Sequence, residues 1–452
     1  MKNQNIIQAG LDSVWHPLTQ HKGLAQNPPT HMVKGEGCYL TDSQGKQYLD
    51  AVAGIWCVNV GYGRQELADV AQQQMMNLPY LAPTMTNNAT VNLASKLLSL
   101  LDMEGQVYFS NSGSEANEAA FKMVWQYHAQ SGKSGSFARQ KIISRHRAYH
   151  GNTMAGMNAT GQAERKMGYG PSIPGFIHIP PPYPYRRNEK FTAAEHGLEC
   201  AKILEETIIY EGAESVAAFI MEPMISGGGV LIPPHEYLPA VRAICDKYGV
   251  LLIFDEVVAG FGRTGEMFGH QHWKDIQADI VTCAKGIASG YAPLGATVVK
   301  QEIFETFKGP DAMSHFRHVN TYGGHPVSTA VGLRNIQMIE DENLVENARK
   351  MGAYLQQQLE EEFIEHPNVG EIRGKGLLTG IEMVEDRESK MPMKSADTGS
   401  IVNTCKQEGV ILGRNGTTVP GLSNVLLISP PLIIEETHVD QIVDALKVAL
   451  KN

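Results

Sequence analysis

The sequence has no long hydrophobic run and no apolar leader. Its longest apolar runs, such as 216–221 and 250–254, are far shorter than the roughly 18 residues that span a bilayer. The first residues, Met1 to Asn5, lead into no uninterrupted apolar segment, so we expect no secretory signal. These absences argue against a membrane protein and against a secreted one.

Paired cysteines and blocks of like charge are also missing. The six cysteines are scattered without a C-x-x-C pair, which is typical of reduced core thiols in a cytoplasmic protein. The net charge of -10 is spread along the chain and argues against a nucleic-acid partner. A chain of 452 residues can bury a large core without disulfides or metal ions, and we expect no metal site. Composition therefore favours an intracellular enzyme.

The middle of the chain alternates short apolar runs with stretches that have helical character. Runs that are buried on both faces and separated by helices are typical of a parallel sheet. The sequence therefore predicts an α/β fold whose mostly parallel, doubly wound central sheet is flanked by helices. The expected strands are 107–109, 141–143, 215–221, 250–254 and 279–283, and an expected helix covers 114–127.

Beyond about residue 325 the pattern changes, which predicts a second, smaller α+β domain. We expect a large domain over 61–324 and a small discontinuous domain over 1–60 and 325–452. The expected helices of this last part are 326–340, 344–363 and a C-terminal amphipathic helix, and its expected strands are 376–383, 410–412 and 425–429.

Two local features carry further expectations. Thr437 is expected to cap the last amphipathic helix, because a threonine just before an apolar face is a common helix start. The segment 170–187 is rich in Pro and Tyr, and we expect it to form a long excursion over the surface.

The motif Ser110 to Glu118 follows an apolar strand and opens a helix. Ser112 and Glu115 have the spacing of a capping box, which places Gly113 and Ser114 in the first turn. Their N–H groups have no acceptor within the helix, and Gly113 lets an anion approach, so the motif predicts a phosphate site. An ordinary capped helix is the alternative.

An acid pair and a lysine end two further strands. Asp255 and Glu256 follow an apolar strand, and ligands of open α/β sheets bind at such carboxyl ends. A carboxylate satisfied by loop amides is the alternative there. Lys285 closes another apolar strand beside small residues, which suits a desolvated amine able to form a Schiff base. Phosphate site, acid and lysine together point to pyridoxal phosphate (PLP).

The stretch Gly260 to Gly265 formally matches G-x-G-x-x-G. We discount it as a dinucleotide fingerprint, because acids separate it from the strand and the residues after it make a poor helix start.

These motifs together resemble the class III aminotransferases of the fold-type I PLP enzymes, and the resemblance covers essentially the whole chain. Within the class, the stretches 14–20 and 54–61 are most similar to the ω-amino acid–pyruvate branch, and to its taurine–pyruvate aminotransferases in particular. The other motifs that carry the resemblance are 149–151, 221–223, 254–257, 262–265, 320–326 and 373–377.

The resemblance implies a role for each residue around the cofactor. Lys285 would hold PLP and later carry a proton, and Asp255 would bond the pyridine nitrogen. Val257 and Tyr149 would pack against the two faces of the ring. The remaining cofactor-binding residues would be Ser112, Gly113 and Ser114 at the phosphate, His150 and Glu222 near the ring, and Thr321 from the other subunit. For His150, a packed and hydrogen-bonded histidine is the alternative.

The resemblance also implies substrate contacts and an assembly. Trp56 matches an aromatic wall of the active-site mouth, and Arg414 matches a mobile arginine that receives a carboxylate. A core tryptophan and a surface arginine are the respective alternatives. A cofactor site completed by Thr321 of the partner subunit implies a homodimer, and pairing of dimers into tetramers stays open.

The expected activity is transfer of an amino group from an ω-amine, such as taurine or β-alanine, to pyruvate, giving an aldehyde and alanine. The alternative within the class is 7,8-diaminopelargonate synthase, which uses S-adenosylmethionine as donor. A nicotinamide-dependent dehydrogenase and a non-catalytic PLP-binding protein are the alternatives outside it.

Overall fold

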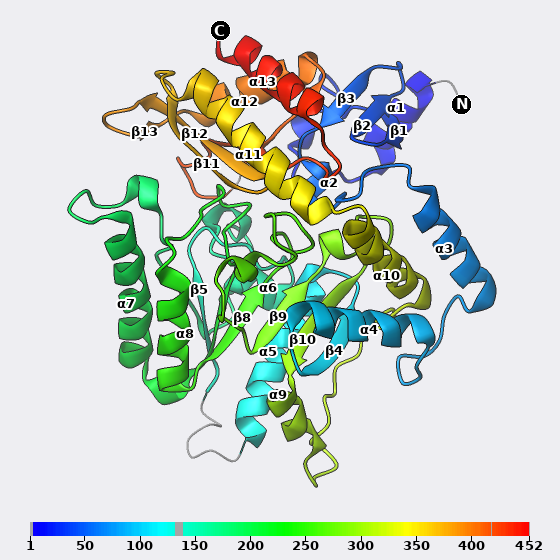
Figure 1. Cartoon of the computed structure of the whole chain (residues 1–452), viewed down its shortest axis with the longest axis vertical. Coiled ribbons are helices and arrows are strands. Elements are labelled where there is room, and N and C mark those ends of the chain that lie inside the picture. The colour runs from blue at the N-terminus through cyan, green and yellow to red at the C-terminus, as the bar shows by residue number, and fades with distance from the viewer. Residues whose placement is uncertain (1–2, 132–138, 417, 452) are drawn as a thin grey trace.

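The computed structural model describes residues 3–131, 139–416 and 418–451. A large sheet with helices on both faces forms the lower part of the view in Figure 1. Two smaller sheets with the C-terminal helices lie above it, and strands from near both ends of the chain meet there.

The large central sheet has seven strands, and all but one run in the same direction. β10 is antiparallel to both of its neighbours, β4 and β9, whereas the remaining neighbours pair in parallel. The order across the sheet is β4 (Gly105–Ser110), β10 (Gly295–Lys300), β9 (Ile280–Cys283), β8 (Leu251–Asp255), β7 (Val216–Met221), β5 (Lys141–Arg145) and β6 (Phe176–Ile179). The predicted α/β fold with a mostly parallel sheet is confirmed.

Both faces of this sheet are buried, which explains the unbroken apolar runs of its strands. In β7, Phe219 belongs to one hydrophobic cluster and Ile220 to another on the opposite face. One cluster includes α5 (Gly113–Gln130) and α6 (Met154–Ala159). The other includes α4 (Asn88–Leu101), α7 (Ala193–Glu211), α8 (Tyr237–Tyr248) and α10 (Pro326–Asp341).

The two smaller sheets combine distant parts of the chain. The first orders β1 (Met32–Glu36), β2 (Tyr39–Asp42), β3 (Gln47–Asp50) and β14 (Val410–Ile411), so the N-terminal strands pair with a C-terminal one. The second contains β11 (Val369–Lys375), β12 (Leu378–Asp386), β16 (Val425–Ile428) and β15 (Gly413–Arg414), and β13 (Met391–Pro392) pairs with β12. α11 (Leu344–Phe363), α12 (Ser395–Gln407) and α13 (Glu436–Leu450) pack against these sheets and each other. The domain boundaries stay a prediction.

The remaining helices lie in the first hundred residues and after β10. They are α1 (Asn3–Ser13), α2 (Ala53–Trp56), α3 (Gln65–Asn77) and α9 (Gln301–Glu305).

Two local expectations are wrong. The segment 170–187 is not a surface excursion, because Phe176–Ile179 forms the edge strand β6 and Tyr183 is buried between the guanidinium groups of Arg147 and Arg373. The cap of α13 is Glu435 rather than Thr437, which lies inside the first turn. The start of α13 is set by a capping box between Glu435 and His438.

Within the described part of the chain, no helix has both the length and the hydropathy to cross a membrane. All six cysteines are free thiols, and all but Cys57 are buried.

Candidate active site

A cavity of about 560 Å³ lies at the carboxyl ends of the parallel strands. Residues from the N-terminal part, from the central sheet and from the 414–416 segment line it together. Of the twelve residues predicted for the site, eleven line this cavity: Trp56, Ser112, Gly113, Ser114, Tyr149, His150, Glu222, Asp255, Val257, Lys285 and Arg414.

The N-terminal end of α5 forms one wall of this cavity. Ser112 is the N-cap, and its Oγ accepts a hydrogen bond from the N–H of Glu115 at 3.2 Å. The Glu115 carboxylate accepts from the N–H of Asn111 at 2.7 Å, one residue earlier than a capping box requires. The N–H groups of Gly113 and Ser114 therefore stay at the open end of the helix, where an anion is favoured.

Asp255 ends β8 and is held by a buried hydrogen-bond network. Its Oδ2 accepts from Nδ2 of Asn117 and from Nδ1 of His150, both at 2.8 Å, and its Oδ1 accepts from the N–H of Val257 at 3.1 Å. Thr282 donates in turn to Oδ1 of Asn117 at 2.8 Å. These three hydrogen bonds fix the orientation of the Asp255 carboxyl group at the cavity.

Glu256, the second acid of the pair, has a structural role. Its carboxylate accepts from the N–H groups of Gly269 and His270 and from the imidazole of His270, all within 2.8 Å. The alternative of an acid satisfied by loop amides therefore holds for Glu256, whereas Asp255 accepts one backbone N–H and takes its other hydrogen bonds from the side chains of Asn117 and His150.

Glu222 lies beside this network and is also buried. It accepts from the N–H groups of Tyr149 at 3.1 Å and Ser226 at 2.9 Å. Burial raises the pKa of its carboxyl group, and the neighbouring His150 only partly opposes that shift. Glu222 thus orients the backbone N–H groups of Tyr149 and Ser226 beside the cavity.

Lys285 follows β9 and enters the cavity from a strained position. Its φ angle is 48°, a left-handed conformation that is uncommon for residues other than glycine. Its Nζ lies 5.8 Å from the ring centroid of Trp56. Trp56 is half-buried, lines the cavity and also packs against a hydrophobic cluster that includes Val230 and Val425.

Arg414 lies at the edge of the cavity, on β15. Its Nη1 donates to the carbonyl of Ser395 at 2.6 Å and to the Ser395 Oγ at 2.9 Å. It also lines an adjoining cavity of about 610 Å³, together with Arg165 and Ser395. Arg414 therefore borders both cavities.

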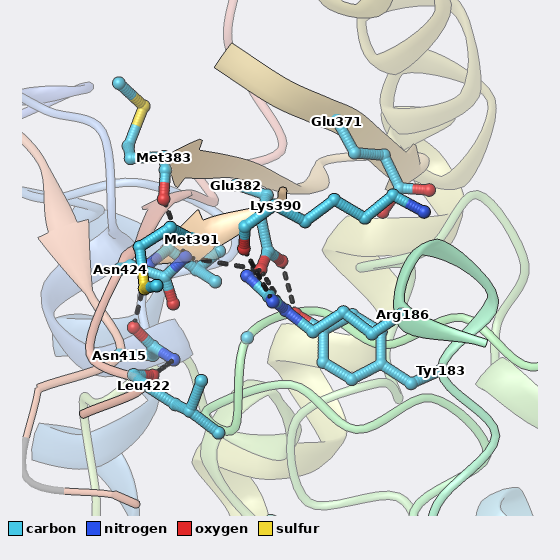
Figure 2. Close-up of polar contacts among 12 residues, drawn as sticks. Tyr183, Arg186, Glu371, Glu382, Met383, Lys390, Met391, Asn415, Leu422 and Asn424 are labelled. Carbon is cyan, nitrogen blue, oxygen red and sulfur yellow. Dashed lines mark hydrogen bonds and ion pairs between the residues drawn. The ribbon is translucent and has the colours of Figure 1, made fainter. Parts of the chain in front are cut away.

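A buried polar cluster fixes the segment behind Arg414 (Figure 2). Asn415 accepts from the N–H of Val425 at 2.9 Å and donates to the carbonyl of Leu422 at 3.0 Å. Asn424 donates to Glu382 at 3.2 Å, and Glu382 also binds Arg186 at 2.7 Å. Tyr183 and Arg373 complete the ring of donors around Glu382.

Thr321 does not line the cavity of its own chain. It is exposed, and its carbonyl accepts a hydrogen bond from the hydroxyl of Tyr80 at 3.0 Å. Its predicted role in a partner's site stays a prediction.

The stretch Gly260 to Gly265 belongs to the scaffold. No helix begins directly after Gly265, and the buried Arg263 between the glycines binds the carbonyl of Leu377 and Oδ1 of Asn59. This geometry differs from a strand–turn–helix phosphate loop.

Comparison with known proteins decides the family. The family model described as aminotransferase class-III matches residues 22–450. The chain belongs to the class III aminotransferases. The resemblance seen in the motifs is thereby confirmed, and the nicotinamide-dependent dehydrogenase is wrong.

Individual relatives match over nearly the full length of this aminotransferase. A taurine–pyruvate aminotransferase of Bilophila wadsworthia is 46% identical over 434 residues, covering 95% of this chain and 93% of the relative. A crystal structure of a Bacillus anthracis aminotransferase is 47% identical with a TM-score of 0.96, covering 100% and 99%. The ω-transaminase from Pseudomonas jessenii in complex with PMP is 37% identical with a TM-score of 0.93, covering 99% and 97%.

The cavity of the aminotransferase fits PLP, the cofactor of this family. A Cβ atom added to Gly113 would lie 2.8 Å from a methyl group of Val257, so a side chain there would fill the space beside the helix end. The buried Nε2 of His150 has no hydrogen-bond partner among the described residues. An anion site, an oriented carboxylate and a lysine amine thus border one space, which is the donor set that a phosphorylated pyridine aldehyde requires.

Several cavity residues received no role in the sequence analysis, and Asn117 and Arg165 are two of them. Asn117 was quoted within the motif Ser110 to Glu118 but received no role, because its contact with Asp255 joins positions 138 residues apart. Arg165 also lines the cavity. Its Cζ lies 5.4 Å from the ring centroid of Tyr149. Nothing in the local sequence around Arg165 distinguishes it from a surface arginine.

Proposed function

We propose that this aminotransferase moves the amino group of an ω-amine such as taurine or β-alanine to pyruvate, releasing an aldehyde and alanine. The observation that carries the proposal is the composition of one cavity, where Lys285 and the Asp255 network share a space with two arginines. Similarity to the Bilophila wadsworthia taurine–pyruvate aminotransferase supports this choice of donor and acceptor.

The cofactor-binding roles follow from the positions of the side chains. PLP, when bound, supplies a conjugated ring that accepts the electron pair released at the substrate carbon. Asp255 would hold the proton at the ring nitrogen, with its carboxylate oriented by Asn117 and His150. Val257 and Tyr149 would keep the ring plane fixed between them.

The phosphate would bind at the start of α5. The N–H groups of Gly113 and Ser114 would donate to it, with Ser112 holding the helix end open. We include in the proposal a homodimer in which Thr321 of the partner subunit completes this site, and a cytoplasmic location consistent with the free cysteines.

Lys285 would have two roles, as the covalent attachment point of the cofactor and as the group that transfers protons. Its Nζ would bind the aldehyde carbon of the cofactor until an amine displaces it. The released amine would then move a proton between the substrate carbon and the cofactor carbon. Arg414 would receive the carboxylate of pyruvate, and Trp56 would limit the width of the substrate beside the reacting carbon.

A donor and acceptor panel tests the proposal. Purified holoenzyme is mixed with taurine, β-alanine or a diamine, and with pyruvate or 2-oxoglutarate, and alanine and glutamate are quantified. We expect alanine from taurine or β-alanine with pyruvate. The Lys285→Ala variant is the control and should lose both turnover and the visible absorbance of the bound cofactor.

Two results would contradict the proposal. If glutamate forms from 2-oxoglutarate and no ω-amine yields alanine with pyruvate, the amino acceptor is 2-oxoglutarate and not pyruvate. Turnover of S-adenosylmethionine with the 7-oxo precursor of 7,8-diaminopelargonate would favour the biotin-pathway alternative.

A further inference from the structure

The backbone around Lys285 has an uncommon conformation. Lys285 opens the 3₁₀ turn Lys285–Ile287 with a φ angle of 48°, and Ser289 just after the turn has a φ angle of 47°. Left-handed residues other than glycine are disfavoured, because their Cβ atom crowds the backbone. Such a conformation persists only where the surrounding structure holds it. The contacts of this turn therefore decide how the Lys285 side chain enters the cavity.

The three carbonyl oxygens of the turn all accept hydrogen bonds. The oxygen of Lys285 accepts from the N–H of Ala288 at 3.2 Å. The oxygens of Gly286 and Ile287 accept from Nδ2 of Asn335 at 2.8 and 3.0 Å. Asn335 lies on α10 and is fully buried, and Gly286 and Ile287 are buried as well. A different backbone conformation at Lys285 would turn these two oxygens away from Asn335 and leave them unpaired in the core.

The packing of its own helix does not explain the amide of Asn335. Its Oδ1 is buried and has no hydrogen-bond partner among the described residues, which is unfavourable for folding. Both hydrogen bonds of its Nδ2 go to the turn that Lys285 opens, 49 and 48 residues earlier in the chain. An apolar side chain would fill the same place on α10 without an unpaired oxygen, but it would leave two carbonyls of the turn unpaired.

A second asparagine packs against the same turn. A Cβ atom added to Gly286 would lie 2.5 Å from Nδ2 of Asn59 and 3.1 Å from Cβ of Phe261. Asn59 is itself fixed, because its Nδ2 donates to the carbonyl of Phe261 at 2.8 Å and its Oδ1 accepts from Arg263 at 2.8 Å. Asn59 therefore limits the space around Gly286, and Asn335 fixes the direction of its carbonyl group.

We propose that Asn335 is a positioning residue for Lys285. Its amide holds the two carbonyls that follow the lysine, and it thereby keeps Nζ aimed at the aldehyde carbon of the cofactor. The inference rests on the proposed role of Lys285 as the attachment point of PLP. Asn335 is not among the described residues that line the cavity, so it acts through the backbone of the turn.

The release of two cofactor forms from the holoenzyme tests this role. PLP can be bonded to Lys285, whereas pyridoxamine phosphate has an amine in place of the aldehyde and cannot. Both forms share the phosphate and ring contacts, so the ratio of their release rates after dilution isolates the effect of the lysine. We expect Asn335→Leu to release PLP about tenfold faster and pyridoxamine phosphate at the wild-type rate, because two hydrogen bonds that hold the turn are lost.

Two further variants separate positioning from stability. Asn347 on α11 donates to the carbonyls of Leu432 and Ile434 at 2.6 and 2.9 Å, and neither of these residues lines the cavity. Asn347→Leu also removes two hydrogen bonds and should lower the Tm, but both release rates should keep their wild-type values. Asn335→Gln keeps an amide donor and should recover part of the slow release of PLP.

The outcomes separate the inference from the role on which it rests. If Asn335→Leu accelerates the release of both cofactor forms equally, or of neither, Asn335 does not position Lys285. If Lys285→Ala releases PLP at the wild-type rate, Lys285 is not the attachment point, and the proposed role of Lys285 fails together with the inference. If Asn335→Leu does not fold, Asn335→Ser removes the amide without adding apolar bulk, and the same comparison of release rates decides.

Discussion

At the scale of single residues, the site depends on buried polar contacts made by side chains far apart in the chain. Asn117 is the clearest case, because it touches Asp255, the carbonyl of His150 and the hydroxyl of Thr282 at once. Its amide donates two hydrogen bonds and accepts one, a combination that a carboxamide side chain supplies and a carboxylate does not.

The substitution Asn117→Asp should make cofactor binding depend on pH. The introduced carboxyl group would face the Asp255 carboxylate, so its pKa would rise and the folded protein would favour its protonated form. Stability and cofactor affinity should therefore fall as the pH rises above the ordinary aspartate value of about 4. The apo-variant is titrated with PLP at pH 5.5 and at pH 8.5, and the cofactor affinity is read from the visible absorbance. If the ratio of the affinities at the two pH values equals that of wild type, the prediction is wrong.

At the scale of elements, the cavity is positioned by strands and by the segments that follow them. Glu382 on β12 is fully buried, and its donors come from the 183–186 segment, from β11 and from Asn424 before β16. Burial alone would raise the pKa of Glu382, but Arg373, Tyr183 and Arg186 together hold it below its usual value. This cluster therefore ties the β6 side of the central sheet to the sheet that carries Arg414.

The substitution Glu382→Gln should destabilise the protein by about 3–5 kcal/mol at pH 7, because it leaves the partly buried Arg186 and Arg373 without this buried carboxylate. A lowered folded pKa contributes stability that is present above the unfolded value and is lost as the pH falls through the folded value. The difference between wild type and variant should accordingly shrink below about pH 4.5.

Urea unfolding at several pH values measures that difference. Glu371→Gln is the matched control, because Glu371 pairs with the same Arg373 at 2.6 Å but is partly exposed, and it should cost about 1 kcal/mol or less. A pH-independent difference for Glu382→Gln would contradict the electrostatic origin of its effect.

At the scale of the whole molecule, the cavity forms where the two ends of the chain meet the central sheet. Trp56 comes from the N-terminal part and Arg414 from the C-terminal part, and β3 pairs with β14 beside them. Thr321 lies outside the cavity of its own chain, as a residue that acts in a partner's site would.

Mixing two defective chains tests a shared site. Thr321→Val should weaken PLP binding about tenfold or more, since a hydroxyl bonded to a charged phosphate is lost. In a mixed dimer with Lys285→Ala, one site keeps its lysine and receives the intact Thr321 of the partner subunit. Mixed dimers purified from co-expressed, differently tagged chains should therefore be more active at limiting PLP than the Thr321→Val homodimer. Equal activity would mean that Thr321 does not contribute to the partner's site.

Much of the fold was predictable because its signals are local. The ranges 326–340 and 344–363 agree closely with α10 and α11, and the apolar runs at 215–221 and 250–254 became β7 and β8. The strand β10 was missed because it follows a glycine-rich stretch and runs opposite to its neighbours. The strand β6 was missed because its four residues are flanked by prolines and glycines, which indicated a loop.

The sequence alone determined the family, the strand-end positions of Asp255 and Lys285, and the cap that opens α5, because each depends on residues that are close in the chain. Tertiary structure alone decided that Glu256 is structural, that His150 and Asn117 hold Asp255, and that Arg165 faces the same cavity as Arg414. The reason is physical. Periodicity and capping are short-range, whereas the partner of a buried charge is set by which distant segments the packed core brings together.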